Sequence, residues 1–236
     1  MKRLLLILLI IPLAFGCAKV DSLYDMDDQW TTGQGGKDDP IVFAHERDYN
    51  AFNSITELEK RFHACAVPDN ILRQKTTRAL GLSILHYPMN SLIFAYNYYD
   101  MPVKIVYDHS PLHRELAARA DAADALVGIF ENTRIDKDVY HVATNYQDIS
   151  LADELFLEYF LGSGLVKGLD KGNNKKKLAD AVAMKRDRRL ADPDLNGTLA
   201  LIPLAYMSER LGLGVRFSDE IVSSMHYFTL EEDLFK

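Results

Sequence analysis

Helix-start signals recur along this chain, and each is followed by apolar residues three or four positions apart. Ser110 precedes Pro111, which combines an N-cap residue with a proline at the first helical position. Ser150 precedes the apolar segment 151–161, and Ser218 opens another short helical pattern. No half of the sequence is rich in strand signals. The sequence therefore predicts a mainly α fold, an irregular multi-helix bundle.

The same pattern places helices in the first half of the body. Ser54 and Glu57 have the spacing of a capping box, and the apolar residues that follow put Cys65 on a buried face. Tyr87-Pro88 breaks the next helical pattern. Residues 89–100 are apolar nearly all round, which is typical of a helix inside a bundle. Helices are expected at 54–66, 77–86, 89–100, 111–130, 151–161 and 198–211.

The first residues have the marks of a secretory signal. Lys2 and Arg3 precede the apolar run 4–15, which is too short to span a membrane, and Gly16 precedes Cys17. With a cysteine at the expected cleavage site, the segment resembles a bacterial lipoprotein signal. The resemblance implies that residues 1–16 are removed and that Cys17 carries an acyl chain such as palmitate. It also implies a membrane anchor in the cell envelope, at the outer membrane.

The remainder of the chain divides into a spacer and a body. Residues 17–40 are rich in aspartate and glycine and poor in apolar side chains, which is typical of a flexible, self-repelling tether. Residues 41–236 are long enough for one large helical domain or two small ones. The polar connection 132–148 is the candidate boundary between two helical subdomains.

The composition narrows the range of partners and the means of stabilisation. The formal net charge of −7 argues against nucleic-acid binding, which needs a basic footprint. Cys17 and Cys65 are the two cysteines, so a lipid on Cys17 leaves Cys65 without a disulfide partner. In an oxidising compartment, the body would then depend on its hydrophobic core alone.

Several short motifs, whose residues look like packing positions, occur between residues 77 and 130. They are Thr77-Arg-Ala-Leu80, Tyr87-Pro88, Phe94-Ala-Tyr-Asn97, Glu115-Leu and Arg119-Ala-Asp-Ala122. The series is similar to a helical domain of unknown function in secreted proteins and lipoproteins of Bacteroidetes. The resemblance covers about a quarter of the chain. It implies a helical fold, agrees with the lipoprotein signal and implies no active-site residue.

Asp192, Asp194 and Asn196 are the best candidates for a metal site. With the glycine that follows, they match the first half of an EF-hand calcium loop. Pro203 replaces the glutamate that would complete the ligand shell, so Ca²⁺ would be held weakly. The alternative is an Asp-Pro turn followed by an Asn-Gly turn, with Thr198 capping the next helix.

Two further pairs have spacings that enzymes use. His109 and His113 are four residues apart, as in helical zinc sites, but a helix start at Pro111 would separate them. Solvated or capping histidines are the alternative. Glu154 and Glu158 share a helix face, which suits acid–base chemistry only if one of them is desolvated. We expect this pair to form the water-facing stripe of an apolar helix.

Two surfaces are candidates for binding. The segment 167–189 concentrates basic side chains that could contact acidic groups or form a solvated helix face. Its candidate residues are Lys175, Lys176, Lys177, Lys185, Arg186, Arg188 and Arg189. The other candidates are Tyr96, Tyr98 and Tyr99, which could stack on sugar rings or a partner, or could belong to the core.

Two functions are compatible with these patterns. The first is a non-catalytic binding or scaffolding protein for a protein or glycan partner, anchored to the lipid bilayer through Cys17. The second is a metal-dependent envelope hydrolase built on the loop 192–196, or on His109 and His113. No catalytic motif is complete in the sequence, and the first function is the one we expect.

Overall fold

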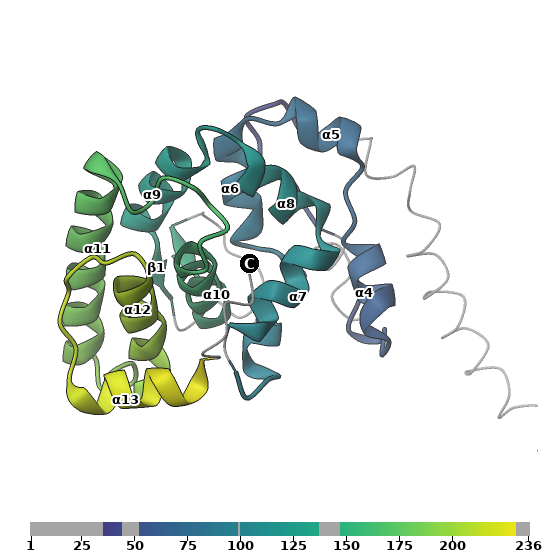
Figure 1. The fold of residues 1–236 in the computed structure, drawn as a ribbon. Helices are drawn as coiled ribbons and strands as arrows, with labels where there is room; N and C mark the ends of the chain where they lie inside the picture. Colours follow the sequence, from purple (N-terminus) through teal and green to yellow (C-terminus); the bar gives the residue numbers. More distant parts are fainter. Residues whose placement is uncertain (1–34, 44–51, 99, 137–146, 230–236) are drawn as a thin grey trace, which may run out of the picture.

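The computed structural model describes residues 35–43, 52–98, 100–136 and 147–229, and in these ranges the chain is a mainly α bundle (Figure 1). The predicted multi-helix fold is confirmed. The strands pair in parallel, and no helix of the described ranges is long and apolar enough to cross a membrane. The elements are α4 (Leu58–Ala64), α5 (Asp69–Gln74), α6 (Thr77–Ile84), the 3₁₀ helix η2 (Pro88–Phe94), α7 (Met101–His109), α8 (Pro111–Ala118), α9 (Ala122–Asn132), β1 (Arg134–Ile135), β2 (Asp148–Ile149), α10 (Leu151–Gly162), α11 (Gly172–Ala191), α12 (Thr198–Arg210) and α13 (Asp219–Phe228).

Helix α10 is the centre of the bundle and is buried nearly all round. The Ser150 side chain accepts a hydrogen bond from the Asp153 amide and so caps the first turn. From Glu154 onward, every residue of the helix is buried. Gly162 lies against α12, where a Cβ would come within 2.7 Å of the Tyr206 ring. The missing side chain therefore lets α10 and α12 approach closely.

Two groups of helices cover α10. On one side, α11 packs against α9 and α12, and α13 packs against α12 and crosses below α11 and α12 in the view of Figure 1. On the other side, η2 and α7 contact α10, and α6 packs against α8 and α9. Buried apolar side chains of both groups form one cluster that extends from Ile41 to Met225. Residues 137–146 lie outside the described ranges, so a subdomain boundary at 132–148 stays a prediction.

The segment 35–43 is attached to the body beside α5 and α6. The Gly36 carbonyl accepts a hydrogen bond from Lys75 Nζ at 2.9 Å. Ile41 and Phe43 are buried in the core. This attachment lies on the opposite side of the body from α13 (Figure 1).

The predicted helix starts are correct where a single N-cap serine marks them. The side chains of Ser110 and Ser218 accept hydrogen bonds from amides in the first turns of α8 and α13, which confirms both caps. The capping box predicted at Ser54 is wrong, because α4 begins at Leu58 and has no side-chain cap.

Residues 111–130 form two helices instead of the predicted one, because the chain is extended at Arg119. The Arg119 guanidinium donates to the carbonyls of Leu72 and Lys75 at 2.9 and 2.6 Å. The Leu72 carbonyl also accepts a hydrogen bond from the Lys75 amide, so Arg119 adds donors to the carbonyls at the end of α5. The single helix predicted at 89–100 is also wrong. The helix η2 ends at Phe94, before the end of the predicted segment. The next helix, α7, begins at Met101, and Pro102 in its first turn prevents a helix from running into α7 from the preceding residues.

Candidate functional site

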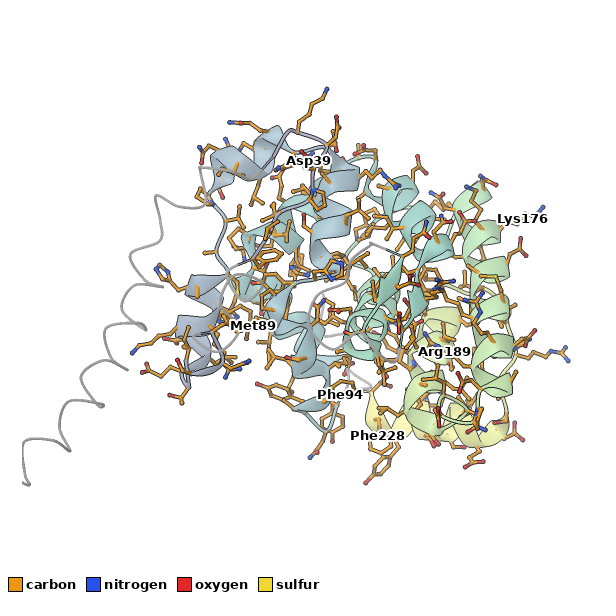
Figure 2. The ribbon with its side chains drawn as sticks, turned by 180° about the vertical axis from the view of Figure 1, so that it is seen from behind. Asp39, Met89, Phe94, Lys176, Arg189 and Phe228 are labelled. Atoms are coloured by element: carbon orange, nitrogen blue, oxygen red, sulfur yellow. The ribbon has the colours of Figure 1, made fainter. Side chains whose placement is uncertain are left out.

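The basic residues of α11 divide into a buried pair and an exposed set. Lys185 and Arg189 are each 3% exposed, and Arg189 points into the bundle (Figure 2). Lys176 and Arg188 are exposed, and Lys176 points away from the body (Figure 2). The prediction that Lys185 and Arg189 belong to a binding surface is therefore wrong.

Lys185 and Arg189 meet Glu154 and Glu158 on the facing helix α10. Lys185 Nζ lies 2.5 Å from Glu154 Oε1, and the Arg189 guanidinium donates to both Glu158 carboxylate oxygens at 2.6 and 2.9 Å. Each helix presents its two charged residues four positions apart, so the two ion pairs lie one helical turn from each other. We call these four residues the buried charge network.

Neighbouring groups complete the buried charge network. Lys185 Nζ donates to the Thr133 carbonyl and lies 4.6 Å from the centroid of the Phe130 ring. Arg189 Nη1 also donates to the Ala200 carbonyl in the first turn of α12. The network therefore connects α10 and α11 to the end of α9 and to α12.

The prediction that Glu154 and Glu158 face water is wrong, because both side chains are buried. Desolvation raises the pKa of Glu158 to about 7, although the nearby Arg189 opposes this effect. Two cations balance two carboxylates, and the bidentate contact of Arg189 with Glu158 favours their charged forms. Because the network is enclosed, we assign it a structural role.

Arg186 fixes the loop that follows α12. Its Nη2 lies 2.7 Å from Asp187 Oδ1, and its Nη1 donates to the Arg216 carbonyl at 2.7 Å. The guanidinium carbon lies 5.9 Å from the centroid of the Phe217 ring. Arg186 was predicted to contact a partner, but its hydrogen bonds are directed toward its own chain.

The rest of the predicted basic surface is partly used within the chain. Lys177 Nζ lies 3.5 Å from Glu131 Oε2. Lys175, Lys176 and Arg188 have no ion pair among the described residues. These three residues remain candidates for contact with acidic groups.

The aromatic candidates are exposed to different degrees. Tyr98 is 41% exposed and Tyr96 is half-buried, whereas Tyr99 lies outside the described residues. Phe94, at the end of η2, is 49% exposed. A role of these side chains in stacking on a ligand stays a prediction.

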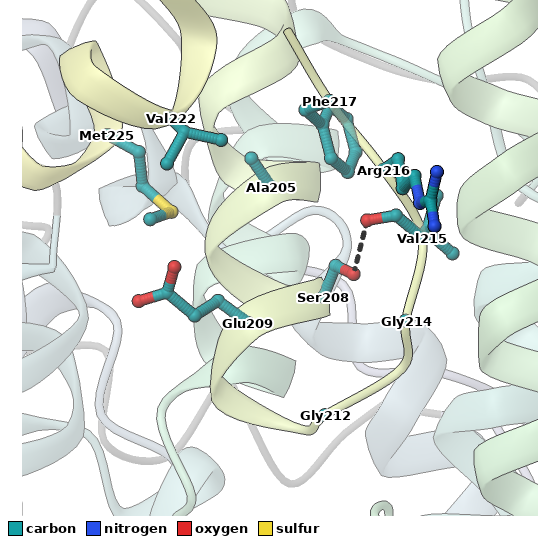
Figure 3. Close-up of a pocket in the computed structure, with 10 residues that line it drawn as sticks. All are labelled: Ala205, Ser208, Glu209, Gly212, Gly214, Val215, Arg216, Phe217, Val222 and Met225. Carbon is teal, nitrogen blue, oxygen red and sulfur yellow. Dashed lines mark hydrogen bonds between the residues drawn. The ribbon is translucent and has the colours of Figure 1, made fainter. Parts of the chain in front are cut away.

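A hollow of about 480 Å³ lies over α12, between α13 and the loop that follows α12 (Figure 3). Ala205 and Ser208 of α12 form its floor. Val222 and Met225 of α13 form one wall, and Phe217 lies on the side of the loop (Figure 3). The lining is mostly apolar, as in typical ligand sites.

The loop after α12 is held in place at several points. Gly212 has a φ of 59°, a left-handed conformation that favours glycine. Its amide donates to the Glu209 carbonyl, and the next amide donates to the Ser208 carbonyl at 2.8 Å, which are the two bonds of a Schellman motif. The Ser208 hydroxyl donates to the Val215 carbonyl at 3.1 Å (Figure 3). The hydrogen bond from Arg186 then fixes the end of the loop.

A second hollow of about 320 Å³ adjoins the first. Its apolar lining comes from Leu190, Leu201 and Ile221. Arg216 and Phe217 line both hollows and form the ridge between them. We call the two hollows and this ridge the α12–α13 groove.

The predicted metal loop is a hydrogen-bonded turn. Asp192 Oδ1 accepts a hydrogen bond from the Asp194 amide at 2.9 Å, and the Asp192 carbonyl accepts one from the Asn196 amide. Over its described ranges, the chain has no group of three or more His, Cys, Asp or Glu side chains placed to hold a metal ion. The cap expected at Thr198 is wrong, since Gly197 occupies the N-cap position. Weak Ca²⁺ binding stays a prediction.

His109 and His113 lie on different helices. His109 ends α7, where its Nδ1 lies 2.8 Å from the Ile105 carbonyl oxygen and its ring stacks on Phe62. His113 is fully buried in α8, and its Nδ1 lies 2.9 Å from Ser110 Oγ. The expectation of a solvated or capping histidine is therefore wrong for His113.

Cys65 lies at the end of α4 and is buried, which confirms the prediction that it faces the core. Burial raises the pKa of its thiol. A thiol that is both protonated and enclosed is an unreactive part of the core.

The α12–α13 groove was not among the predicted sites. Its residues come from α11, α12, α13 and a loop, and no short motif in the sequence predicts that these segments lie side by side. The spacing of Gly212 and Gly214 indicates a turn but not a binding surface. Comparison with protein-family models, with curated proteins and with solved structures finds no match for this chain.

Proposed function

We propose that this chain is a non-catalytic binding protein that holds a segment of a partner polypeptide in the α12–α13 groove. The observation that carries the proposal is the groove itself, in which two apolar hollows adjoin a ridge with a fixed main chain. Concave, mostly apolar surfaces with a few fixed polar groups are the usual form of a binding site. Because the ridge is already ordered, binding would cost little conformational entropy there.

The proposed location is the bacterial cell envelope, at the outer membrane, with a lipid on Cys17. The support for this location is the signal-like segment 1–17, which lies outside the described residues. The attachment of residues 35–43 beside α5 and α6 agrees with it, since a tether there leaves the groove on the far side of the body (Figure 1).

A charge on the wall of the first hollow tests the binding role. Random displayed peptides are selected on the purified chain 17–236, and the affinity of the selected peptides is then measured. We expect Val222→Arg to weaken their binding at least about tenfold, because a guanidinium would occupy an apolar hollow. Ser223→Arg is the matched control, since Ser223 is the exposed neighbour of Val222 on α13. It should leave the affinity unchanged.

Two results would contradict the proposed function. One is that no peptide is enriched on the folded wild-type chain. The other is that the selected peptides bind wild type and Val222→Arg equally well while both chains melt at the same temperature.

A further inference from the structure

The ridge of the α12–α13 groove carries a cation that is available to a ligand. Arg216 is exposed, lines both hollows and has no ion pair among the described residues. Nearby charges are already engaged, because Arg186 contacts Asp187. At the other end of the first hollow, Glu209 lies 3.5 Å from His226, a contact that is ionic only when the histidine is protonated. Arg216 is therefore the cation of the groove that has no ion pair among the described residues.

The main chain of Arg216 is fixed before any ligand arrives. The Arg216 carbonyl accepts the hydrogen bond from Arg186, and the preceding carbonyl, of Val215, accepts one from Ser208. The guanidinium therefore projects from a constant position between two apolar hollows. A guanidinium can hold a carboxylate through two parallel hydrogen bonds, and the hollows suit apolar side chains on either side.

We propose that the α12–α13 groove binds a partner's peptide segment in which a carboxylate lies between two apolar side chains, and that Arg216 recognises the carboxylate. The inference rests on the proposed function and names the class of its ligand. The apolar side chains would supply most of the burial, whereas Arg216 would select acidic segments over neutral ones.

Two synthetic peptides provide the probe. Both are nonapeptides with Leu and Phe on either side of a central pair, which is Asp-Glu in one peptide and Asn-Gln in the other. We expect the wild-type chain to bind the acidic peptide about threefold to tenfold more tightly than the amide peptide. The preference should decrease with added salt, because an exposed ion pair is screened.

Arg216→Gln should remove this preference and leave the affinity for the amide peptide unchanged. Arg78→Gln is the matched control, since Arg78 is exposed on α6 and lines neither hollow. It should keep the wild-type preference. A preference lost equally in both variants would overturn the assignment to Arg216, because it would then reflect net charge alone.

Failure of this inference differs from failure of the proposed function. If library peptides depend on Val222 but the wild type does not prefer the acidic probe, the ligand class is wrong and the groove still binds peptides. If neither probe nor library binds, both proposals fail.

Tighter probe binding by a chain ending at Thr229 would assign the groove to the chain's own C-terminal residues. Self-association that Val222→Arg abolishes would assign it to a second copy. Either result would overturn the assignment to a partner.

Discussion

His113 is an ionisable side chain enclosed by aromatic rings. Its ring centroid lies 4.9 Å from that of Tyr87 and 5.6 and 5.5 Å from those of Phe156 and Phe160. Nε2 has no hydrogen-bond partner among the described residues. Burial lowers the pKa of His113 to about 3, so the ring is neutral in the folded chain at pH 7.

The lowered pKa predicts that His113 makes the fold sensitive to acid. Its ordinary pKa is 6.5, so below that pH the unfolded chain takes up a proton that the folded chain excludes. The stabilising contribution is complete above pH 6.5 and is lost as the pH falls toward about 3. His113→Phe keeps an aromatic ring and removes the titrating group. Between about pH 7.5 and 5, the wild type should lose about 2 kcal/mol of unfolding free energy relative to the variant.

The measurement is urea unfolding of both chains at the two pH values. A direct comparison with the variant is needed because other groups titrate in this range. Glu158, whose pKa is raised, has the opposite sign and loses stabilisation as the pH rises. That contribution is common to both chains and cancels in the difference. Unfolding free energies that change in parallel with pH would contradict the assignment to His113.

At the scale of elements, the buried charge network fixes α11 onto α10. The two helices are connected by residues 163–171, and their facing charged residues are 31 positions apart in the sequence. A buried ion pair gains little over an apolar pair of similar shape, because both charges must leave water. We infer that its role is to make one position of α11 on α10 lower in free energy than the alternatives, since any shift of the helix would leave buried charges unpaired.

Removing one partner of the network should therefore cost more than removing both. Arg189→Met leaves the Glu158 carboxylate buried without its cation, and we expect the unfolding free energy to fall by about 3–5 kcal/mol. Arg189→Met combined with Glu158→Leu replaces the pair by apolar side chains and should recover most of that loss. Chemical unfolding at pH 7 measures both variants.

Arg188→Met is the control for this comparison. It changes the neighbouring arginine of the same helix, which is exposed, and should alter the unfolding free energy by no more than about 0.5 kcal/mol. If Arg188→Met and Arg189→Met cost the same, Arg189 would have no special role in fixing α11.

A feature can be predicted from the sequence when the contact that determines it joins residues close together in the chain. The caps at Ser110, Ser150 and Ser218 rest on hydrogen bonds within three residues, and all three are confirmed. In the sequence, Glu158 and Arg189 each look like a charged residue of a helix surface. Their burial follows only from the way in which α10 and α11 face each other in the fold.

The α12–α13 groove illustrates the same limit for the candidate site. Its floor, wall and ridge come from Ser208, Val222 and Arg216, and each of these residues is unremarkable in its own segment. The pairing of His109 with His113 was wrong for a related reason. Spacing along the chain places His109 and His113 together only if one helix contains both, and the chain changes helix at Ser110.

At the scale of the molecule, the attachment of residues 35–43 lies on the opposite side from α13, which forms one wall of the α12–α13 groove (Figure 1). With a lipid on Cys17, the eighteen residues up to Gly35 limit the distance between bilayer and body to about 60 Å. The groove would then lie on the side of the body away from the tether.

Lipid attachment is tested by the location of the chain in a bacterial host. We expect the wild type to remain in the membrane fraction after washing with high salt, and Cys17→Ser to appear in the soluble fraction. Cys65→Ala is the matched control and should stay with the membrane, because Cys65 is buried in the core. An unmodified Cys17 in the mass spectrum of the mature chain would remove the anchor and leave only secretion.

The position of the attachment also determines how the protein would carry tension. A pull from the bilayer would enter the body beside α5 and α6, where Lys75 holds the Gly36 carbonyl. A pull from a bound partner would enter at α12 and α13. Between these points lie α10, α11 and α12, which the buried charge network links through Lys185 and Arg189. A cross-link of this kind resists sliding of one helix past another, so the network would stiffen the body between the two points.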